Sequence, residues 1–306
     1  MTDTKHSRYL PQHTNWYKDL PARDESDSED PNIFDNLNHV DDTFLEISRS
    51  SSKLRGVMLF FGIPLFPIAI LLMIFASDVS SLVRDLGWLS VLFPISICGL
   101  LATGIHGIRL DTTTPRDEPV RFNRKRSKVY LYEYKHNWNP FGRWGAVIKE
   151  FDWNTLQAEV TREAGFNGKI YLVYYALNLV SLKPGTNEVV ERFKLVSNPS
   201  FDTLYPSLWA YLKQYMRGEA IAQSEAPIRD QSISLRNSIV EWLPYLDFGA
   251  HGREWVKEPW LILLTLITLP AAPIMILIAL CHYIALRVAP AAAWPPTLDL
   301  ESRSPR

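Results

Sequence analysis

Three long apolar blocks without a charged residue constrain this chain more than any other feature of its sequence. They run from Gly56 to Ala76, from Leu86 to Ile108 and from Trp260 to Leu286. Each is long enough to cross a hydrocarbon core of about 30 Å, at about 1.5 Å per helical residue. Buried helices of a soluble protein normally keep a polar edge, and these blocks have none. The sequence therefore predicts a membrane protein with about three transmembrane helices.

The third block leaves two arrangements open, because Pro270 and Pro273 interrupt its middle. Membrane helices tolerate proline when neighbouring groups satisfy the freed carbonyls, so a tilted single span is one interpretation. A re-entrant pair of half-helices is the other. One crossing is the simpler expectation.

Lysine and arginine near the block ends predict the orientation, because they are retained on the cytoplasmic side. Arg49, Lys53 and Arg55 precede the first block and a basic run over 109–128 follows the second, whereas the short Ser77–Asp85 loop holds only Arg84. We expect the N-terminus and the main domain to be cytoplasmic, and the loop and the tail 289–306 to lie on the far side.

Several function classes lack their sequence signals. The chain has no CxxC pair, no HExxH motif and no histidine cluster with ligand spacing, so we expect no metal and no cofactor. It also lacks a nucleophile elbow, a phosphate-binding loop and a kinase signature, which predicts a non-enzymatic protein. With 32 basic against 33 acidic residues there is no overall basic field, so a nucleic acid partner is not expected.

The remaining sequence divides into polar and mixed segments. An acidic run over 24–30 predicts that residues 1–53 form a disordered cytoplasmic arm, with docking to a partner as an alternative. The hairpin of the first two blocks covers 54–110, and the third transmembrane segment covers 259–288. Between them, 111–218 is expected to form a β-rich domain and 219–258 a helical linker.

The β-rich domain shows strand patterns followed by one helical pattern. The strand candidates are Pro119–Phe122, Lys128–Tyr134, Val147–Phe151, Trp153–Val160 (a strand or a short helix), Lys169–Tyr175, Ala176–Leu182 and Glu188–Leu195. They are not separated by crossover helices, so the sheet must be antiparallel. An amphipathic helix is expected from Pro206 to Arg217. This order predicts an antiparallel barrel or sandwich of the pleckstrin-homology-like type with a C-terminal helix.

Five basic residues cluster on the first expected hairpin and form the first half of a candidate binding site. They are Arg121, Arg124, Lys125, Arg126 and Lys128. Near an anionic membrane each basic side chain contributes about 1 kcal/mol of attraction, so contact with lipid head groups is one interpretation. The alternative is that these charges only fix the membrane orientation. Both interpretations use the same residues and stay open.

Aromatic residues form the second half of the candidate site. They are Tyr130, Tyr132, Trp138, Phe141 and Trp144. Successive residues of a strand face opposite sides, so Tyr130 and Tyr132 cannot share the core with Val129 and Leu131. Their face needs a cover, for which we expect a partner protein, the membrane surface or the Trp138–Trp144 loop.

The stretch Pro119–Tyr130, with Asn139–Trp144 and Asp152-Trp153, resembles a proteobacterial family of unknown function that pairs a membrane hairpin with a β-rich segment. The resemblance covers about Asp42 to Gly218. Members of that family are often encoded beside type VI secretion spike and toxin genes. The resemblance therefore implies an inner-membrane immunity or accessory protein that binds a secreted toxin or spike component. A membrane-anchored scaffold or adaptor that senses lipid head groups is the alternative function.

Overall fold

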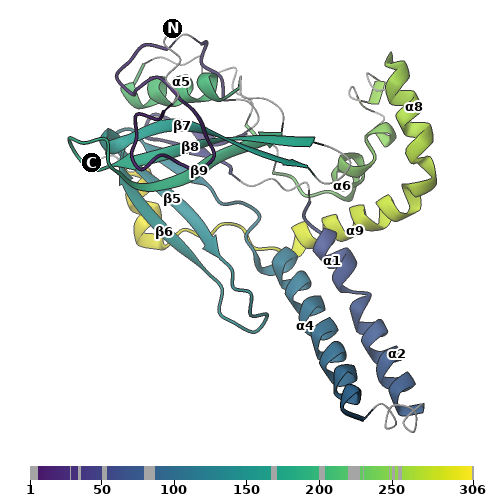
Figure 1. Cartoon of the computed structure of the whole chain (residues 1–306). Coiled ribbons are helices and arrows are strands. Elements are labelled where there is room, and N and C mark those ends of the chain that lie inside the picture. The colour runs from purple at the N-terminus through teal and green to yellow at the C-terminus, as the bar shows by residue number, and fades with distance from the viewer. Residues whose placement is uncertain are drawn as a thin grey trace.

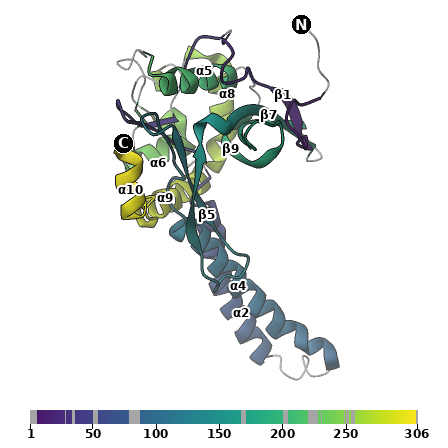
Figure 2. The same cartoon turned by 90° about the vertical axis from the view of Figure 1, so that its left-hand side faces the viewer.

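The structure, a computed structural model, contains a folded α+β domain from which apolar helices extend. Figure 1 and Figure 2 show this arrangement from two sides. The described residues are 6–27, 29–33, 36–49, 54–78, 87–166, 171–199, 204–219, 228–229, 231–247, 249, 252–253 and 257–304.

Five antiparallel strands form the first sheet, in the order β2-β3-β4-β5-β6. They are β2 (Leu37–Val40), β3 (Phe44–Ile47), β4 (Val120–Asn123), β5 (Lys128–Lys135) and β6 (Gly145–Asp152). The predicted first hairpin is confirmed, because Val120 lies opposite Leu131 and Asn123 lies opposite Lys128.

Four antiparallel strands form the second sheet, in the order β1-β7-β8-β9. They are β1 (Trp16–Asp19), β7 (Leu156–Phe166), β8 (Tyr171–Leu182) and β9 (Val189–Pro199). A short helix η3 (Trp153–Thr155) precedes β7. The candidate Trp153–Val160 therefore begins as a short helix and continues as a strand. The two strands expected over 169–182 form one strand, although Lys169 and Ile170 lie outside the described residues.

Both sheets and the helix α5 (Leu204–Arg217) contribute to one hydrophobic core. Phe122 and Val129 enter it from the first sheet, Leu177 and Leu179 from the second, and Trp209 from α5. The expected antiparallel sheets and C-terminal helix are confirmed. A closed barrel is wrong for the described strands, because they form two separate open sheets.

The N-terminal arm differs most from its prediction. Instead of being disordered, it supplies β1, β2 and β3, and Leu37 and Leu45 are fully buried. Its acidic run also contacts the domain, because Asp27 forms an ion pair with the buried Lys213 of α5 at 2.7 Å. These strands pair with strands that lie more than seventy positions later in the sequence. The local polarity of the arm therefore could not predict that it folds.

Three helices of the described chain are long and apolar enough to cross a membrane. The first two segments form a hairpin. Its elements are α1 (Val57–Gly62), α2 (Leu65–Asp78), η2 (Gly87–Val91) and α4 (Leu92–Thr113). A Cβ on Gly62 would lie 3.1 Å from the carbonyl oxygen of Gly104, so the two segments approach closely. The expected Ser77–Asp85 loop lies outside the described residues from position 79 onward.

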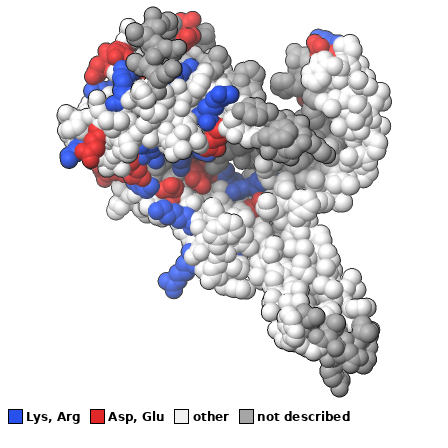
Figure 3. Space-filling view, viewed as in Figure 1, with Lys and Arg blue, Asp and Glu red and all other residues white. Residues whose placement is uncertain are grey.

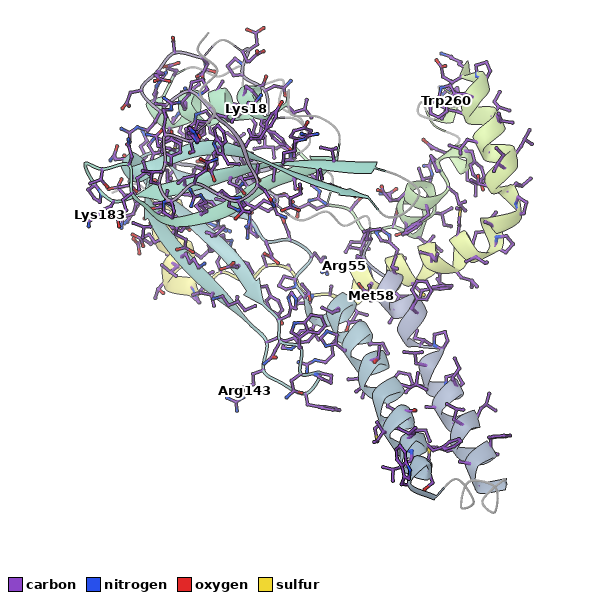
Figure 4. The ribbon with its side chains drawn as sticks, in the orientation of Figure 1. Lys18, Arg55, Met58, Arg143, Lys183 and Trp260 are labelled. Atoms are coloured by element: carbon purple, nitrogen blue, oxygen red, sulfur yellow. The ribbon has the colours of Figure 1, made fainter. Side chains whose placement is uncertain are left out.

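Polar contacts join this hairpin to the domain. The Arg55 guanidinium donates to the carbonyl oxygens of Thr114 at 3.0 Å and Pro115 at 2.7 Å. The buried Asp111 carboxylate accepts the backbone N–H of Leu59 at 2.7 Å and so satisfies a free donor at the start of α1. Arg55 and Met58 mark this junction in Figure 4.

The third apolar segment is broken at its prolines. It consists of α8 (Pro259–Thr268), η5 (Leu269–Ala271) and α9 (Ala272–Val288). The expected linker helix is α6 (Leu235–Trp242), which is followed by η4 (Pro244–Leu246). It packs on α9, where Ser238 Oγ lies 3.0 Å from His282 Nδ1. Figure 1 and Figure 2 show α8 extending in the direction opposite to α2 and α4.

The C-terminal tail returns to the domain and ends in α10 (Pro296–Arg303). Asn123 Nδ2 donates to the carbonyl oxygen of Ser302 at 2.9 Å, and the Arg116 backbone N–H donates to Pro290 at 2.9 Å. The tail is thus packed on the domain, whereas the sequence predicted that a membrane would separate the two. The side of the membrane on which the tail lies stays a prediction.

The segment Pro259–Val288 is joined to the domain at both of its ends. The linker before it is bonded to the domain through Arg229, whose backbone N–H donates to Leu37 at 2.8 Å, and the tail after it is bonded to the domain as well. The helix is interrupted at Leu269–Ala271, beside the two prolines. One crossing and two half-helices both stay predictions.

The surface follows the same division. Figure 3 shows the blue and red charged groups over the domain, whereas the hairpin and α8 present long uncharged surfaces. The exposed apolar side chains of α8 include Trp260, Leu263, Leu266 and Ile267.

We predict that Leu45→Ala lowers the free energy of unfolding by about 2–5 kcal/mol, because it leaves a cavity in the core. The control, Leu10→Ala, removes a side chain that is 60% exposed and should cost no more than about 0.5 kcal/mol. Urea unfolding of the detergent-solubilised full chain, followed by tryptophan fluorescence, measures both. Equal stability of the two variants would contradict the buried position of β3.

Candidate functional site

The β4–β5 hairpin places the predicted basic and aromatic residues on its two faces. Arg121 lies opposite Tyr130 in the ladder. Because side chains alternate along a strand, Phe122 and Val129 point into the core, while Arg121 and Tyr130 point to the other face. This outer face is the candidate functional site.

The C-terminal tail covers the part of the outer face around Arg121 and Tyr130. The expected cover by a partner protein or by the membrane surface stays a prediction. Arg121 has a side chain only 3% exposed, and its Nη1 donates to Asp299 Oδ1 at 2.6 Å and to Ser302 Oγ at 2.8 Å. It also forms an ion pair with Glu46 of β3. The ring of Trp294 lies 4.3 Å from its guanidinium carbon, within the range of a cation–π contact.

A second set of contacts centres on Glu301 of α10. Its Oε1 accepts from Arg126 Nη1 and from the Tyr130 hydroxyl, both at 3.2 Å. Lys128 Nζ lies 3.9 Å from the same oxygen and also pairs with Glu150. Two carboxylates of α10, Asp299 and Glu301, thus bind a large part of the predicted basic cluster.

Burial raises the pKa of both tyrosines of this face. Burial and the nearby Glu301 carboxylate raise the pKa of the Tyr130 hydroxyl above its usual range. Burial also raises the pKa of Tyr132, whose ring packs edge-on against Trp294 at 5.5 Å. Tyr130 is therefore kept as a hydrogen-bond donor to α10.

Arg124 and Lys125 point elsewhere. Arg124 Nη2 pairs with Asp42 Oδ1 at 2.8 Å, and its guanidinium lies 5.2 Å from the ring centre of Tyr215. Lys125 is exposed. The structure therefore divides the five basic residues into three that face α10, one that faces α5 and one in solvent. Their binding of lipid or partner stays a prediction.

The three remaining aromatic residues lie in the β5–β6 loop, beside α4. Arg109 of α4 donates to the carbonyl oxygens of Pro140 and, at 3.2 Å, Gly142, and it stacks at 4.4 Å on Trp144. Trp138 is 91% exposed and Phe141 is 74% exposed. Figure 4 shows Arg143 at the end of this loop, next to the hairpin. The loop thus presents aromatic rings at the level where the hairpin leaves the domain.

Sequence reasoning missed the partners that complete the site. These are Glu46, Arg109, Trp294, Asp299, Glu301 and Ser302. The Pro295-Pro296 start with acids at positions 299 and 301 was a usable signal for a short helix with an acidic face. The expectation that no metal and no cofactor is needed stays a prediction.

A model of a family of unknown function, DUF6708, matches residues 97–306. This is more than half of the chain, so the protein belongs to that family. The match begins within α4 and includes the tail, both beyond the motifs on which the resemblance rested. Comparisons with curated proteins and with solved structures found no match.

We predict that Asp299→Asn with Glu301→Gln loosens α10 from the sheet. The charged hydrogen bonds at Arg121 and Arg126 each contribute about 1.5–3 kcal/mol, so amide hydrogen exchange over 296–303 should accelerate at least tenfold. The control Glu163→Gln with Glu241→Gln changes two exposed acids and should leave this exchange unaltered. Unchanged exchange in the first variant would show that these carboxylates do not hold the tail.

Proposed function

We propose that this DUF6708 protein is a non-enzymatic, multi-pass inner-membrane protein that acts by binding another protein. Its proposed role is that of an immunity or accessory protein linked to a type VI secretion toxin. The resemblance to a family encoded beside such toxins supports the role, and the arrangement of the apolar helices supports the mode of action.

The membrane placement is supported by the charges at the hairpin ends. Arg55 and Arg109 lie where the hairpin meets the domain, and Arg49 and Arg116 lie close by in sequence. The positive-inside rule then places the domain and the N-terminus in the cytoplasm. The tail joins them there, because it is bonded to the domain.

The position of α8 is the single observation that supports the proposed protein binding. Its side chains are apolar except for two threonines, whose hydroxyls donate to the helix backbone. Trp260, Leu263 and Ile267 are each at least 60% exposed. If α2 and α4 cross the bilayer, α8 lies on the domain side of it (Figure 1). An uncovered apolar helix of this size needs a cover, and we propose that a membrane-acting toxin supplies it.

The domain itself is proposed to be a pleckstrin-homology-like variant. The strands β4 to β9 are followed by α5, as in the expected run of antiparallel strands with a C-terminal helix. The strands β1, β2 and β3, which were not expected, extend the two sheets at their edges. Fold likeness of this kind does not identify a ligand.

The alternative function is that of a membrane-anchored scaffold or lipid-head-group-sensing adaptor. The exposed Trp138 and Phe141 beside α4 favour it, because aromatic side chains accumulate at membrane interfaces. The exposed Arg143 in the same loop would meet anionic head groups.

We predict that a strain lacking this gene is killed by toxin-delivering sister cells and that the wild-type chain restores survival. The triple variant Trp260→Ala, Leu263→Ala, Ile267→Ala should restore survival at least tenfold less well, because it removes the proposed contact while α8 stays apolar. Competition assays with equal membrane levels of each variant measure this.

The matched control is Phe61→Ala, Leu71→Ala, Phe75→Ala, which alters similarly exposed residues of the hairpin. It should protect as well as the wild type. Failure of the wild-type chain to protect would exclude the immunity role and favour the adaptor. Full protection by the α8 variant would exclude α8 as the contact surface.

A further inference from the structure

A cavity of about 300 Å³ lies where the domain, the linker and the tail meet. Its walls come from β2, β3, the segment before β4, the linker and the tail. Its lining residues include Arg116, Arg229, Leu286 and Trp294. This volume is at the lower end of small-ligand sites and suits a compact polar group.

The cavity has an excess of positive charge. Arg116, Arg121, Arg229 and Arg303 line it, against the two carboxylates of Glu46 and Asp117. Asp299 lies just beyond the wall and pairs with Arg121 and Arg303, which lowers the excess from two charges to one. The described residues around the cavity therefore favour a ligand with a single negative charge.

The contacts of each lining arginine show which guanidinium groups can bind a ligand in the cavity. Arg121 is occupied by Glu46 and Asp299. Arg116 donates from Nε to the carbonyl oxygen of Ala289 at 2.8 Å, and no carboxylate of the described residues lies within ion-pair distance of it. This contact orients Arg116 and leaves its other N–H donors for a ligand. Arg229 reaches the same wall and donates to Ser48 Oγ.

The apolar side of the cavity faces the membrane segments. Leu286 is near the C-terminal end of α9, and Trp294 begins the covering tail. A ligand held by Arg116 therefore has its apolar continuation directed toward α9. Arginine binds phosphate through paired N–H donors. A cavity with such donors therefore suits an oxyanion better than a neutral ligand.

We propose that this cavity binds a singly charged phosphate group, with Arg116 and Arg229 as its principal ligands. The position beside α9 indicates an anionic phospholipid head group as the source, and the soluble phosphodiester glycerophosphoglycerol shares the same chemistry. The lipid source rests on the proposed membrane attachment, whereas phosphate binding itself does not.

The test uses the delipidated full chain in detergent, with phosphatidylglycerol or phosphatidylcholine added and bound lipid counted by native mass spectrometry. Wild-type chain should bind one phosphatidylglycerol at least tenfold more tightly than phosphatidylcholine. Arg116→Gln with Arg229→Gln should lose this preference. The control Arg162→Gln with Arg236→Gln removes two charges from exposed positions outside the cavity and should retain it.

A calorimetric titration with glycerophosphoglycerol, a soluble phosphodiester with one negative charge, forms the second part of the test. Binding here without a preference between the two lipids supports the phosphate site with a soluble source. No lipid preference together with no glycerophosphoglycerol binding overturns the proposal, and the wild-type comparison alone suffices if the double variant does not fold. This titration needs no membrane and no toxin. Absence of binding in it would therefore be distinguishable from failure of the proposed function.

Discussion

The buried guanidinium of Arg121 is the interaction on which the arrangement of this chain depends. It lies on the sheet face away from the core, where a strand of the domain would ordinarily meet water. Its partners come from opposite ends of the sequence, Glu46 from β3 and Asp299 from α10. Leaving such a buried charge without partners costs about 3–5 kcal/mol. The N-terminal strands, the domain and the tail are therefore held together by one polar cluster.

This cluster has a consequence for the apolar segments. Because α10 is bonded to the domain, the chain returns to the domain after α9. The prolines at positions 270 and 273 provide the break that such a return needs. The broken segment then leaves α8 apart from the hairpin, which is the basis of the proposed protein contact. The same return path closes the cavity lined by Arg116 and Trp294.

The parts of the fold that depend on local sequence could be predicted. The apolar blocks, the β4–β5 hairpin, β9 and α5 were placed to within a few residues, because periodicity, turns and helix stops are local signals. The N-terminal strands and the tail could not be placed in this way. Leu45 is buried only because β4 supplies its neighbour, and Glu301 is bound only because Arg126 and Tyr130 are folded opposite it.

The candidate site shows the same limit. Five basic residues in one run indicated a binding surface, but their charges alone could not reveal that the chain's own acidic helix occupies part of it. The aromatic residues divided likewise. Tyr130 and Tyr132 are covered by the tail, whereas Trp138 and Phe141 are exposed beside α4. Pairing across long sequence separations decided each of these outcomes.

The most direct test of this account is the side of the membrane on which the tail lies. In a chain whose native cysteines are replaced by serine, Leu300→Cys places a thiol at a position that is 73% exposed, and Ser77→Cys places one at the far end of the hairpin. A membrane-impermeant maleimide added to intact cells should label the Ser77→Cys variant and leave the Leu300→Cys variant unlabelled until the inner membrane is permeabilised. Labelling of both variants in intact cells would place the tail across the bilayer from the domain and would contradict the account.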